Sequence, residues 1–328
     1  MRVYLTGGTG LLGSHVASQL RAAARPVVAL CRSGSNARFL SDLGCDATPG
    51  DVRDSPEDLA RGMEGCTHLV HAAALVYAGG DWSEVRAVNV EGTENVLRAA
   101  ALAGVRHVVH LSSVAVYGTV DGPVDEATPL ARPLPVRDLY GRSKREAETV
   151  ARRLERDLAL PVTVMRPSAV YGERDRLMIP ALARILRSPW VPVFGPGENT
   201  LPVVYAGNVA EAIVLAIDAA RGGETFDVGL DSPITQRQLF AGLAGGLGRS
   251  PRLVPIPATL IRTAVRLLRN LGTGTPGAPH LPLDRVARLA LGENPYPSVR
   301  IREELAWRPR HDHRDALDRS GRWYAGLN

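Results

Sequence analysis

Eight residues near the start of the chain read Thr6-Gly7-Gly8-Thr9-Gly10-Leu11-Leu12-Gly13. They follow a short apolar run, Arg2–Leu5, and open a helix-length segment, Leu11–Ala24. In a dinucleotide-binding turn, the first glycine allows the tight turn, the second lets the backbone approach a pyrophosphate, and the third lets helix and strand pack closely. The helix N-terminus adds free N–H groups and a partial positive charge. The pattern predicts a dinucleotide-binding unit; the alternative is a glycine-rich turn without a ligand.

The same alternation of strand and helix continues to residue 170. Apolar runs that predict buried parallel strands are Arg2–Leu5, Pro26–Leu30, His68–His71, His107–Leu111 and Val162–Met165. Helix-length segments between them are Leu11–Ala24, Asn36–Leu43, Pro56–Met63, Val85–Ala103 and Tyr140–Leu158. Continuously apolar strands indicate a sheet that is covered on both faces. We therefore predict an α/β fold with a doubly wound parallel sheet of the Rossmann type, forming a dinucleotide-binding domain over residues 1–170.

The pattern changes in the second half of the chain. Prolines become frequent and the regular alternation stops, although helical pieces remain at Asn208–Ala220 and Ala258–Leu271. The stretch Gly272–Pro279 is rich in glycine and proline and indicates a mobile loop. We expect residues 171–328 to form a smaller C-terminal substrate-binding lobe that is interleaved with the end of the sheet.

Composition excludes several classes of protein. The 328 residues include 39 Lys plus Arg and 34 Asp plus Glu, which gives a formal net charge of +5. The basic residues are spread along the chain, so no nucleic-acid-binding patch is indicated. The N-terminus lacks the pattern of a signal peptide, and no stretch of about 18 apolar residues predicts a membrane span. We expect a cytoplasmic protein without a membrane partner.

The metal-ligating residue types do not form a recognisable site. His68 and His71 lie three apart on a strand and therefore face opposite ways. The segment His311-Asp312-His313 is interpreted as a solvated turn. The three cysteines lack the spacing of a zinc site or a disulfide framework; they are Cys31, Cys45 and Cys66. No metal is predicted.

The end of the second predicted strand indicates the cofactor. An NAD enzyme usually carries an acidic residue here for the ribose hydroxyls, whereas this chain carries Cys31, Arg32 and Ser33. A guanidinium can bind a 2′-phosphate through two hydrogen bonds, so NADP(H) is predicted to be preferred, with NAD(H) possible. Alternatively, Arg32 caps a solvated loop and stacks on adenine. Asp51, at the end of the third strand, could accept from the adenine amino group or serve as a helix N-cap.

Three residues predict a catalytic site. Tyr140 and Lys144 lie one helical turn apart on one face, and a neighbouring ammonium lowers the pKa of a phenol from its usual value of about 10. Ser113 follows the strand His107–Leu111, where its hydroxyl can polarise a substrate carbonyl. Lys144 is the only lysine in the chain. By itself a Tyr-x-x-x-Lys pair often arises by chance; its order after the glycines and the serine favours a catalytic role.

Taken together, these motifs make the chain similar to the extended short-chain dehydrogenase/reductase family. The matching segments are TGGTGLLG (6–13), GDV (50–52), HAAA (71–74), NVEGT (89–93), SSVAVYG (112–118), YGRSK (140–144) and RPSAVYG (166–172). The resemblance implies that Ser113, Tyr140 and Lys144 form the catalytic triad. It also implies that Lys144 binds the nicotinamide ribose.

Further site residues follow from the same resemblance. It implies that Asn89 lies near the active site, although Asn89 could instead be a helix-terminal polar residue. The residues that it places along the cofactor, besides the glycine stretch and Arg32, Ser33 and Asp51, are Val52, His71, Ala72, Ala73, Arg166, Pro167 and Ser168. For Arg166 the alternative is a surface charge.

Departures from the family pattern indicate the branch. Members that act on nucleotide sugars commonly carry Asn where this chain has Ala169, and Arg where it has Leu201. Other arginines could replace that contact: Arg176, Arg184 or Arg237. The chain looks more like the dihydroflavonol-reductase and 3β-hydroxysteroid-dehydrogenase-like branch, which implies a fairly apolar ketone, aldehyde or alcohol as substrate. Candidate lining residues, which could equally belong to the core, are Leu177, Met178, Trp190, Phe194, Val203 and Tyr205.

The interpretation as an oxidoreductase has two rivals. One is a nucleotide-sugar epimerase or dehydratase, and the other is a non-catalytic NADP(H)-binding sensor, against which the complete triad counts. We also expect a homodimer formed through the helices Val85–Ala103 and Tyr140–Leu158, which the family commonly pairs. The interface residues expected on the first helix are Val85, Val88, Val96, Leu97, Ala99 and Ala103.

Overall fold

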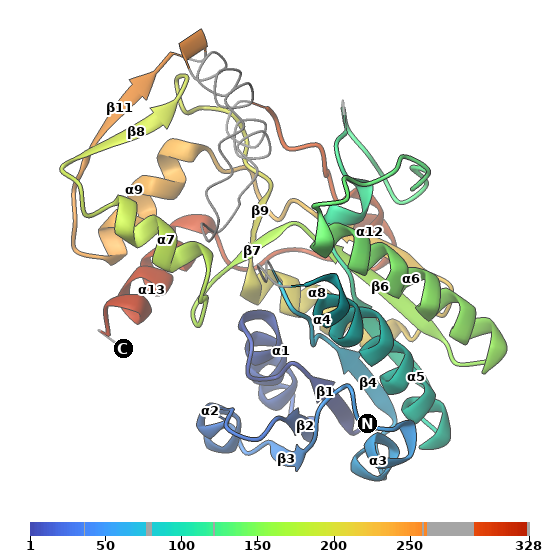
Figure 1. Cartoon of the computed structure of the whole chain (residues 1–328). Helices are drawn as coiled ribbons and strands as arrows, with labels where there is room; N and C mark the ends of the chain where they lie inside the picture. The colour runs from blue at the N-terminus through green and yellow to red at the C-terminus, as the bar shows by residue number, and fades with distance from the viewer. Residues whose placement is uncertain (36, 77–80, 121, 258, 261–291, 327–328) are drawn as a thin grey trace.

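A seven-stranded sheet forms the centre of the larger part of the molecule (Figure 1). The computed structural model describes residues 1–35, 37–76, 81–120, 122–257, 259–260 and 292–326. The strand order is β10-β6-β5-β4-β1-β2-β3, and every neighbouring pair is parallel. The strands are β1 (Val3–Thr6), β2 (Val27–Cys31), β3 (Asp46–Pro49), β4 (His68–His71), β5 (His107–Leu111), β6 (Val162–Pro167) and β10 (Thr225–Val228). The predicted doubly wound parallel sheet is confirmed.

Helices cover both faces of this sheet. On one face lie α1 (Leu11–Ala22) and α8 (Ala206–Ala219). On the other lie α3 (Pro56–Gly62), α5 (Gly92–Leu102) and α6 (Leu139–Asp157). The shorter helical elements beside the sheet are α2 (Arg38–Asp42), α4 (Trp82–Arg86), the π-helical turn η1 (Ala87–Glu91), the 3₁₀ turn η2 (Val114–Tyr117) and α12 (Val299–Glu304).

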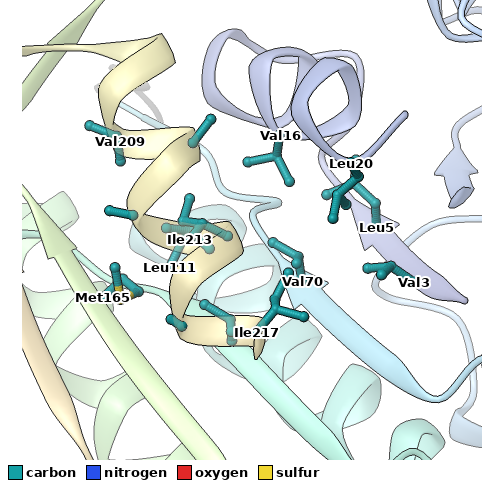
Figure 2. Packing of buried hydrophobic residues seen from close by; sticks show 14 of the residues in the cluster. Val3, Leu5, Val16, Leu20, Val70, Leu111, Met165, Val209, Ile213 and Ile217 are labelled. Carbon is teal, nitrogen blue, oxygen red and sulfur yellow. The ribbon is translucent and has the colours of Figure 1, made fainter. Parts of the chain in front are cut away.

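The alternation of side chains along β1 shows why both faces must be covered. Val3 and Leu5 point into the cluster beneath α1 and α8, whereas Tyr4 points into the cluster beneath α3 and α5. Figure 2 shows the first cluster, where Val16 of α1 and Ile213 of α8 meet above the strands. All five side chains are fully buried, so both faces of the sheet are covered at β1, as in parallel sheets that bind ligands at their strand ends.

The second half of the chain contributes to both parts of the molecule. β10 and α8 complete the sheet and its cover, while a smaller lobe is built around a separate apolar cluster. The elements of this lobe are β7 (Ala169–Tyr171), α7 (Met178–Ile185), β8 (Trp190–Phe194), β9 (Val203–Tyr205), α9 (Gln236–Gly246), β11 (Arg252–Ile256) and α13 (His313–Ala325). The pairs β7–β9 and β8–β11 are each parallel.

Several expected elements differ in detail. The motif Gly50-Asp51-Val52 follows β3 rather than ending it. The long helix expected from Val85 begins at Trp82 and passes through the π-helical turn before α5. The predicted helix Ala258–Leu271, apart from residues 259–260, and the predicted loop Gly272–Pro279 lie outside the described residues.

The residues expected to form a dimer seam on α5 are mostly used within the monomer. Val96, Leu97 and Ala99 are fully buried against the sheet, and Val85 is buried as well. This part of the prediction is wrong, because a helix that lies on a sheet must turn its apolar stripe towards that sheet. The outer surfaces of α5 and α6 instead carry ion pairs, such as the one between Glu94 and Arg153.

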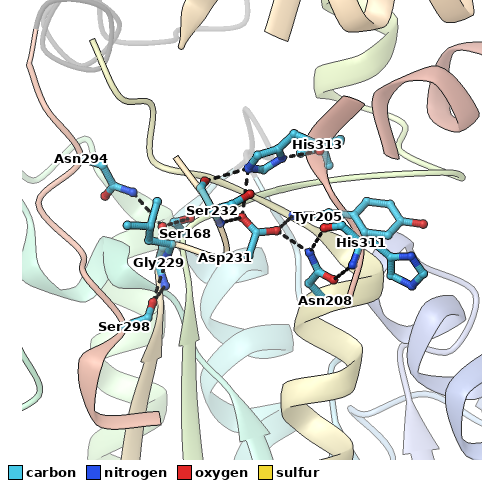
Figure 3. Close-up of polar contacts among 12 residues, drawn as sticks. Ser168, Tyr205, Asn208, Gly229, Asp231, Ser232, Asn294, Ser298, His311 and His313 are labelled. Atoms are coloured by element: carbon cyan, nitrogen blue, oxygen red, sulfur yellow. Dashed lines mark hydrogen bonds and ion pairs between the residues drawn. The ribbon is translucent and has the colours of Figure 1, made fainter. Parts of the chain in front are cut away.

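The segment 311–313 is not a solvated turn, because His313 is buried at the start of α13 (Figure 3). Its Nδ1 lies 2.6 Å from Tyr171 Oη, and its Nε2 lies 2.9 Å from Ser232 O and 3.1 Å from Asp231 Oδ1. Asp231 Oδ2 also accepts from Asn208 at the start of α8. A sequence reading of the charged flanking residues could not reveal this network, which joins α13 to the sheet domain.

Charge pairing in this network predicts a pH-dependent stability. Burial opposes the charged form of His313, but Asp231 outweighs it and raises the pKa of the imidazole above its usual value of about 6.5. The folded state therefore binds this proton more tightly than the unfolded chain. The stabilisation is complete below about pH 6.5 and is lost as the pH rises through the raised pKa.

We expect His313→Gln to lower the free energy of unfolding more at about pH 6 than at about pH 9, because the stabilising charge is present only at the lower pH. Urea melts of both proteins at the two pH values measure this difference. His68→Gln is the matched control, because burial lowers the pKa of His68 and its removal should not give this pattern. A loss of stability that is the same at both pH values would contradict the assignment.

Candidate active site

The glycine turn between β1 and α1 is packed too tightly for side chains. Gly7 has a φ of +73°, and a Cβ there would lie 2.7 Å from the backbone of Ala72 and Ala73. A Cβ at Gly13 would lie 2.2 Å from the carbonyl oxygen of Gly7. At Gly10, the N-cap of α1, an added Cβ would meet only that same carbonyl, at 3.2 Å. The open side of the turn therefore faces away from the protein at the helix N-terminus, which suits a pyrophosphate.

The side chain of His71 is buried and joins β4 to β1 and α5, so it does not face the glycine turn. Its Nδ1 lies 2.7 Å from Thr6 Oγ1, and its Nε2 lies 3.0 Å from Thr93 Oγ1 on α5. Burial lowers the pKa of His71 to about 3, so the imidazole stays neutral. Of the predicted segment 71–73, it is the backbone of Ala72 and Ala73 that lies against the glycine turn.

Lys144 lies at the carboxyl end of β5, beside Ser113. Its Nζ donates to the carbonyl oxygen of Leu111 over 2.6 Å, and the side chain is 4% exposed. Ser113 Oγ donates to Pro167 O at the end of β6, over 3.4 Å, and accepts from the N–H of Ala115. Burial lowers the pKa of Lys144 to about 8, although the charge of Glu148 opposes this. The ammonium is therefore charged at neutral pH but loses its proton readily.

Asn89 positions the helix that carries Tyr140 and Lys144. It is 2% exposed and lies within the π-helical turn, so it is not a helix-terminal polar residue. Its Nδ2 donates to Ser143 Oγ over 2.9 Å, and its Oδ1 accepts from the N–H of Leu75 over 2.7 Å. Ser143 Oγ in turn donates to the carbonyl oxygen of Tyr140. Asn89 thus ties the segment after β4 to the first turn of α6.

Arg166 is not a surface charge, since it is 6% exposed and bonded on several sides. Its guanidinium binds both carboxylate oxygens of Glu148 on α6, over 2.9 and 2.7 Å. It also donates to Tyr117 Oη, which donates to Asp227 Oδ2 on β10. Burial raises the pKa of Asp227 to about 7. This network fixes α6 to the ends of β6 and β10, directly beyond Lys144.

Pro167 and Ser168 lie where β6 leaves the sheet. The carbonyl of Pro167 accepts the hydrogen bond from the Ser113 hydroxyl. Ser168 Oγ donates to the carbonyl of Gly229 over 3.1 Å (Figure 3). The structure thus brings Ser113, Lys144 and Pro167 to one point at the carboxyl end of the sheet, and Tyr140 lies one turn before Lys144 on α6.

A hollow of about 780 Å³ lies at the ends of β2 and β3. Its lining residues are Thr9, Arg32, Ser33, Gly34, Ser35, Pro49, Gly50, Asp51, Arg53, Asp54 and Arg176. Asp51 does not cap a helix, because Ser55 is the N-cap of α3. Both oxygens of the Asp51 carboxylate accept from the guanidinium of Arg53, which holds the pKa of Asp51 below its usual value. Val52 turns away from the hollow into the core, against Gly92.

Residues 3–229 match the sequence profile of the NAD dependent epimerase/dehydratase family. The chain belongs to this family. The predicted membership of the extended short-chain dehydrogenase/reductases is thereby confirmed, and the protein is an enzyme of that type.

Individual relatives of this family member carry different activities. The chain is 31% identical over 325 residues to the 4-hydroxy-2-methyl-3-oxo-4-farnesyl-3,4-dihydroquinoline-1-oxide ketoreductase of Stigmatella aurantiaca, covering 97% of this chain and 95% of the relative. It is 26% identical to the 2-alkyl-3-oxoalkanoate reductase of Stenotrophomonas maltophilia, covering 81% of each. The crystal structure of DesIV, a dTDP-glucose 4,6-dehydratase from Streptomyces venezuelae with NAD and TYD bound, superposes with a TM-score of 0.74 at 28% identity, covering 99% of this chain and 97% of that chain.

Two parts of this enzyme's site were missed by the sequence analysis. Glu148 lies four residues after Lys144, so the spacing Tyr140, Lys144, Glu148 continues one stripe of α6 and could have drawn attention to it. Arg53 holds Asp51 but shows no pattern in the sequence. Within the described residues, no group of three His, Cys, Asp or Glu side chains gathers as metal ligands. No helix among them is both long and apolar enough to cross a membrane.

The candidate substrate-lining residues divide into three groups. Val203 and Tyr205 belong to the core of the smaller lobe, in agreement with the alternative interpretation. Leu177 and Trp190 are 52% and 57% exposed. The remaining two, Met178 and Phe194, are half-buried.

Proposed function

We propose that this enzyme is an NADP(H)-dependent oxidoreductase that interconverts a ketone or aldehyde and an alcohol on a fairly apolar small molecule. The observation that carries the proposal is the placement of Lys144 against the carbonyl of Leu111, beside Ser113 and one helical turn from Tyr140. The ketoreductase and oxoalkanoate reductase among its relatives support a carbonyl substrate with apolar groups.

Ser113, Tyr140 and Lys144 each have a separate role in the proposed reaction. When bound, the nicotinamide supplies or removes the hydride. In the reducing direction, Ser113 Oγ and Tyr140 Oη donate hydrogen bonds to the carbonyl oxygen, whose negative charge grows in the transition state. Tyr140 then gives its proton to that oxygen as a general acid. The Lys144 ammonium favours the tyrosinate that remains, and its charge at neutral pH follows from its pKa of about 8.

The preference for NADP(H) is proposed from the hollow beside the glycine turn. Arg32 is exposed at its rim, and no carboxylate of the described residues forms an ion pair with it. Two acids line the hollow near this strand end: Asp51 is held by Arg53, and Asp54 accepts from the N–H of Asp51. A 2′-phosphate can therefore bind Arg32 without displacing an existing partner. DesIV is described with NAD bound, so NAD(H) is kept as a second cofactor to test.

We expect NADPH to bind roughly 10- to 100-fold more tightly than NADH, because a charge-assisted bidentate contact contributes about 1.5–3 kcal/mol. Arg32→Ala should remove most of this preference by weakening NADPH alone. Fluorescence titration with both cofactors measures the four dissociation constants. Arg98→Ala, on the outer surface of α5, is the matched control and should keep the preference. Equal affinities in the wild type would contradict the cofactor assignment.

A nucleotide-sugar epimerase or dehydratase is the second candidate, which the DesIV likeness favours. Leu201 and Ala169 count against it, because an apolar side chain cannot bind a diphosphate; Leu201 is 7% exposed. Turnover assays with alkyl ketones, 3-oxoalkanoates and dTDP-glucose separate the two. Conversion of dTDP-glucose with no reduction of a ketone would overturn the proposal.

We further propose that the enzyme acts in the cytoplasm as a homodimer. The location is supported by three free buried cysteines, Cys31, Cys45 and Cys66. The dimer is supported by the resemblance that suggested it. Its interface must use the charged outer surfaces of α5 and α6, since the apolar residues first expected there are buried in the monomer.

A further inference from the structure

A loop of the smaller lobe reaches the hollow at the ends of β2 and β3. Residues 172–177, between β7 and α7, are called the crossing loop here. The guanidinium carbon of Arg174 lies 3.4 Å from the ring centroid of Phe39. Phe39 belongs to α2, the next helix after the turn that contains Arg32. Arg176, two residues further along, lines the same hollow as Arg32 and Asp51. The crossing loop therefore spans from the smaller lobe to the end of β2.

The crossing loop is held on both sides of Arg176. Before it, Glu173 accepts from Tyr205 Oη over 2.8 Å and lies 3.6 Å from His15 on α1. After it, the buried carboxylate of Asp175 accepts from the N–H groups of Leu177, Met178 and Ile179 and so fixes the start of α7. The position of Arg176 thus depends on contacts with both parts of the molecule, while its own side chain is exposed.

Two guanidiniums at the hollow form no ion pair with a described residue, although the charge of Arg32 acts on Asp51 from a distance. Three arginines and two aspartates line it. Arg53 is bound to Asp51, and Asp54 accepts from the N–H of Asp51 over 2.7 Å. Neither Arg32 nor Arg176 forms an ion pair or a side-chain hydrogen bond with any residue of the described ranges. Two unpaired guanidiniums at one hollow suit a dianion better than a neutral ribose.

We propose that Arg176 is a second determinant of 2′-phosphate recognition, supplied by the smaller lobe and acting together with Arg32. The inference rests on the proposed use of NADP(H). Arg176 lies more than a hundred positions after the end of β2, where the residues that distinguish NADP(H) from NAD(H) were predicted. A phosphate with two negative charges and three oxygens can accept from both guanidiniums at once. Cofactor choice then depends on the crossing loop as well as on the end of β2.

The test compares Arg176→Ala with wild type on ligands that differ only in the 2′-phosphate. The probes are NADPH against NADH, and 2′,5′-ADP against 5′-AMP. We expect the variant to bind NADPH and 2′,5′-ADP roughly 10- to 100-fold more weakly, and NADH and 5′-AMP within about twofold of wild type. Arg184→Ala, an exposed arginine on α7 that does not line the hollow, should change none of the four affinities.

The outcomes distinguish this inference from the proposed function. If Arg176→Ala weakened the binding of all four ligands equally, Arg176 would contact a phosphate that they share, and the inference would be wrong. Four unchanged affinities would also overturn the inference. If wild type prefers NADPH and Arg32→Ala abolishes the preference while Arg176→Ala does not, only the inference fails. If wild type shows no preference, both fail. In the double variant Arg32→Ala/Arg176→Ala the preference should be absent. The loss should be less than the product of the single effects, because both side chains act on one group.

Discussion

Replacement of Tyr140 by phenylalanine should lower turnover by a factor on the order of 10²–10⁴ and leave the dissociation constant for NADP(H) nearly unchanged. The substitution removes one hydroxyl and keeps the ring, so the packing of α6 is preserved. The lost hydroxyl is the proposed proton donor, and it also stabilises the oxyanion as the hydride arrives. The substitution is therefore expected to lower kcat and not the affinity for the cofactor.

Steady-state kinetics on a ketone that the wild type reduces, together with a cofactor titration, measure both quantities. Tyr324→Phe is the matched control, since Tyr324 is 37% exposed on α13 and far along the chain from the site. Its turnover should equal that of wild type. If Tyr140→Phe kept wild-type turnover, Tyr140 would not be the general acid, and a binding or sensing role would become the better interpretation.

The second large effect concerns stability. Glu148→Ala should lower the free energy of unfolding by about 3–5 kcal/mol, because it leaves the buried guanidinium of Arg166 without its carboxylate. Glu148 and Arg166 are each almost fully buried, with side-chain exposures of 8% and 7%. The bond between them also holds α6, and with it Lys144, against β6.

Urea denaturation of wild type and variant measures this change. Asp318→Ala is the matched control, because its ion pair with Arg322 spans one turn of an exposed helix and should contribute less than about 1 kcal/mol. The double variant Glu148→Leu/Arg166→Met should recover much of the loss, since replacing both charges removes the unpaired one. A cost below that of the control would show that the Arg166–Glu148 pair does not hold α6 in place.

The sequence could predict those features that depend on neighbours in the chain. The glycines of residues 6–13, the apolar runs and the one-turn spacing of Tyr140 and Lys144 are local patterns. Local patterns constrain backbone conformation directly, because a positive φ, a strand period or a helix face requires particular residue types at fixed spacings. The family follows from the same motifs, since they occur in the same order along the chain.

Features that depend on partners from distant segments were decided by the tertiary structure. The sequence showed Arg166 as one arginine among many, and only the fold brings it to Glu148 and Tyr117. His313 looked solvated because its neighbours are charged, yet the return of the chain to the sheet buries it beside Asp231. The stripe on α5 was assigned to a dimer because a sequence shows that a helix is apolar on one side, but not what covers that side.

The sequence by itself determined the parallel sheet, the dinucleotide turn and the identity of the proposed catalytic residues. The tertiary structure decided which charges are paired and which remain open. The fold brings His313 to Asp231 from a distant part of the chain, whereas Arg176, which lines the hollow, forms no ion pair with any described residue. The physical reason is that an ion pair requires two groups within a few ångströms of each other. Crossovers of the chain, rather than spacing along it, set that distance for residues that lie far apart in sequence.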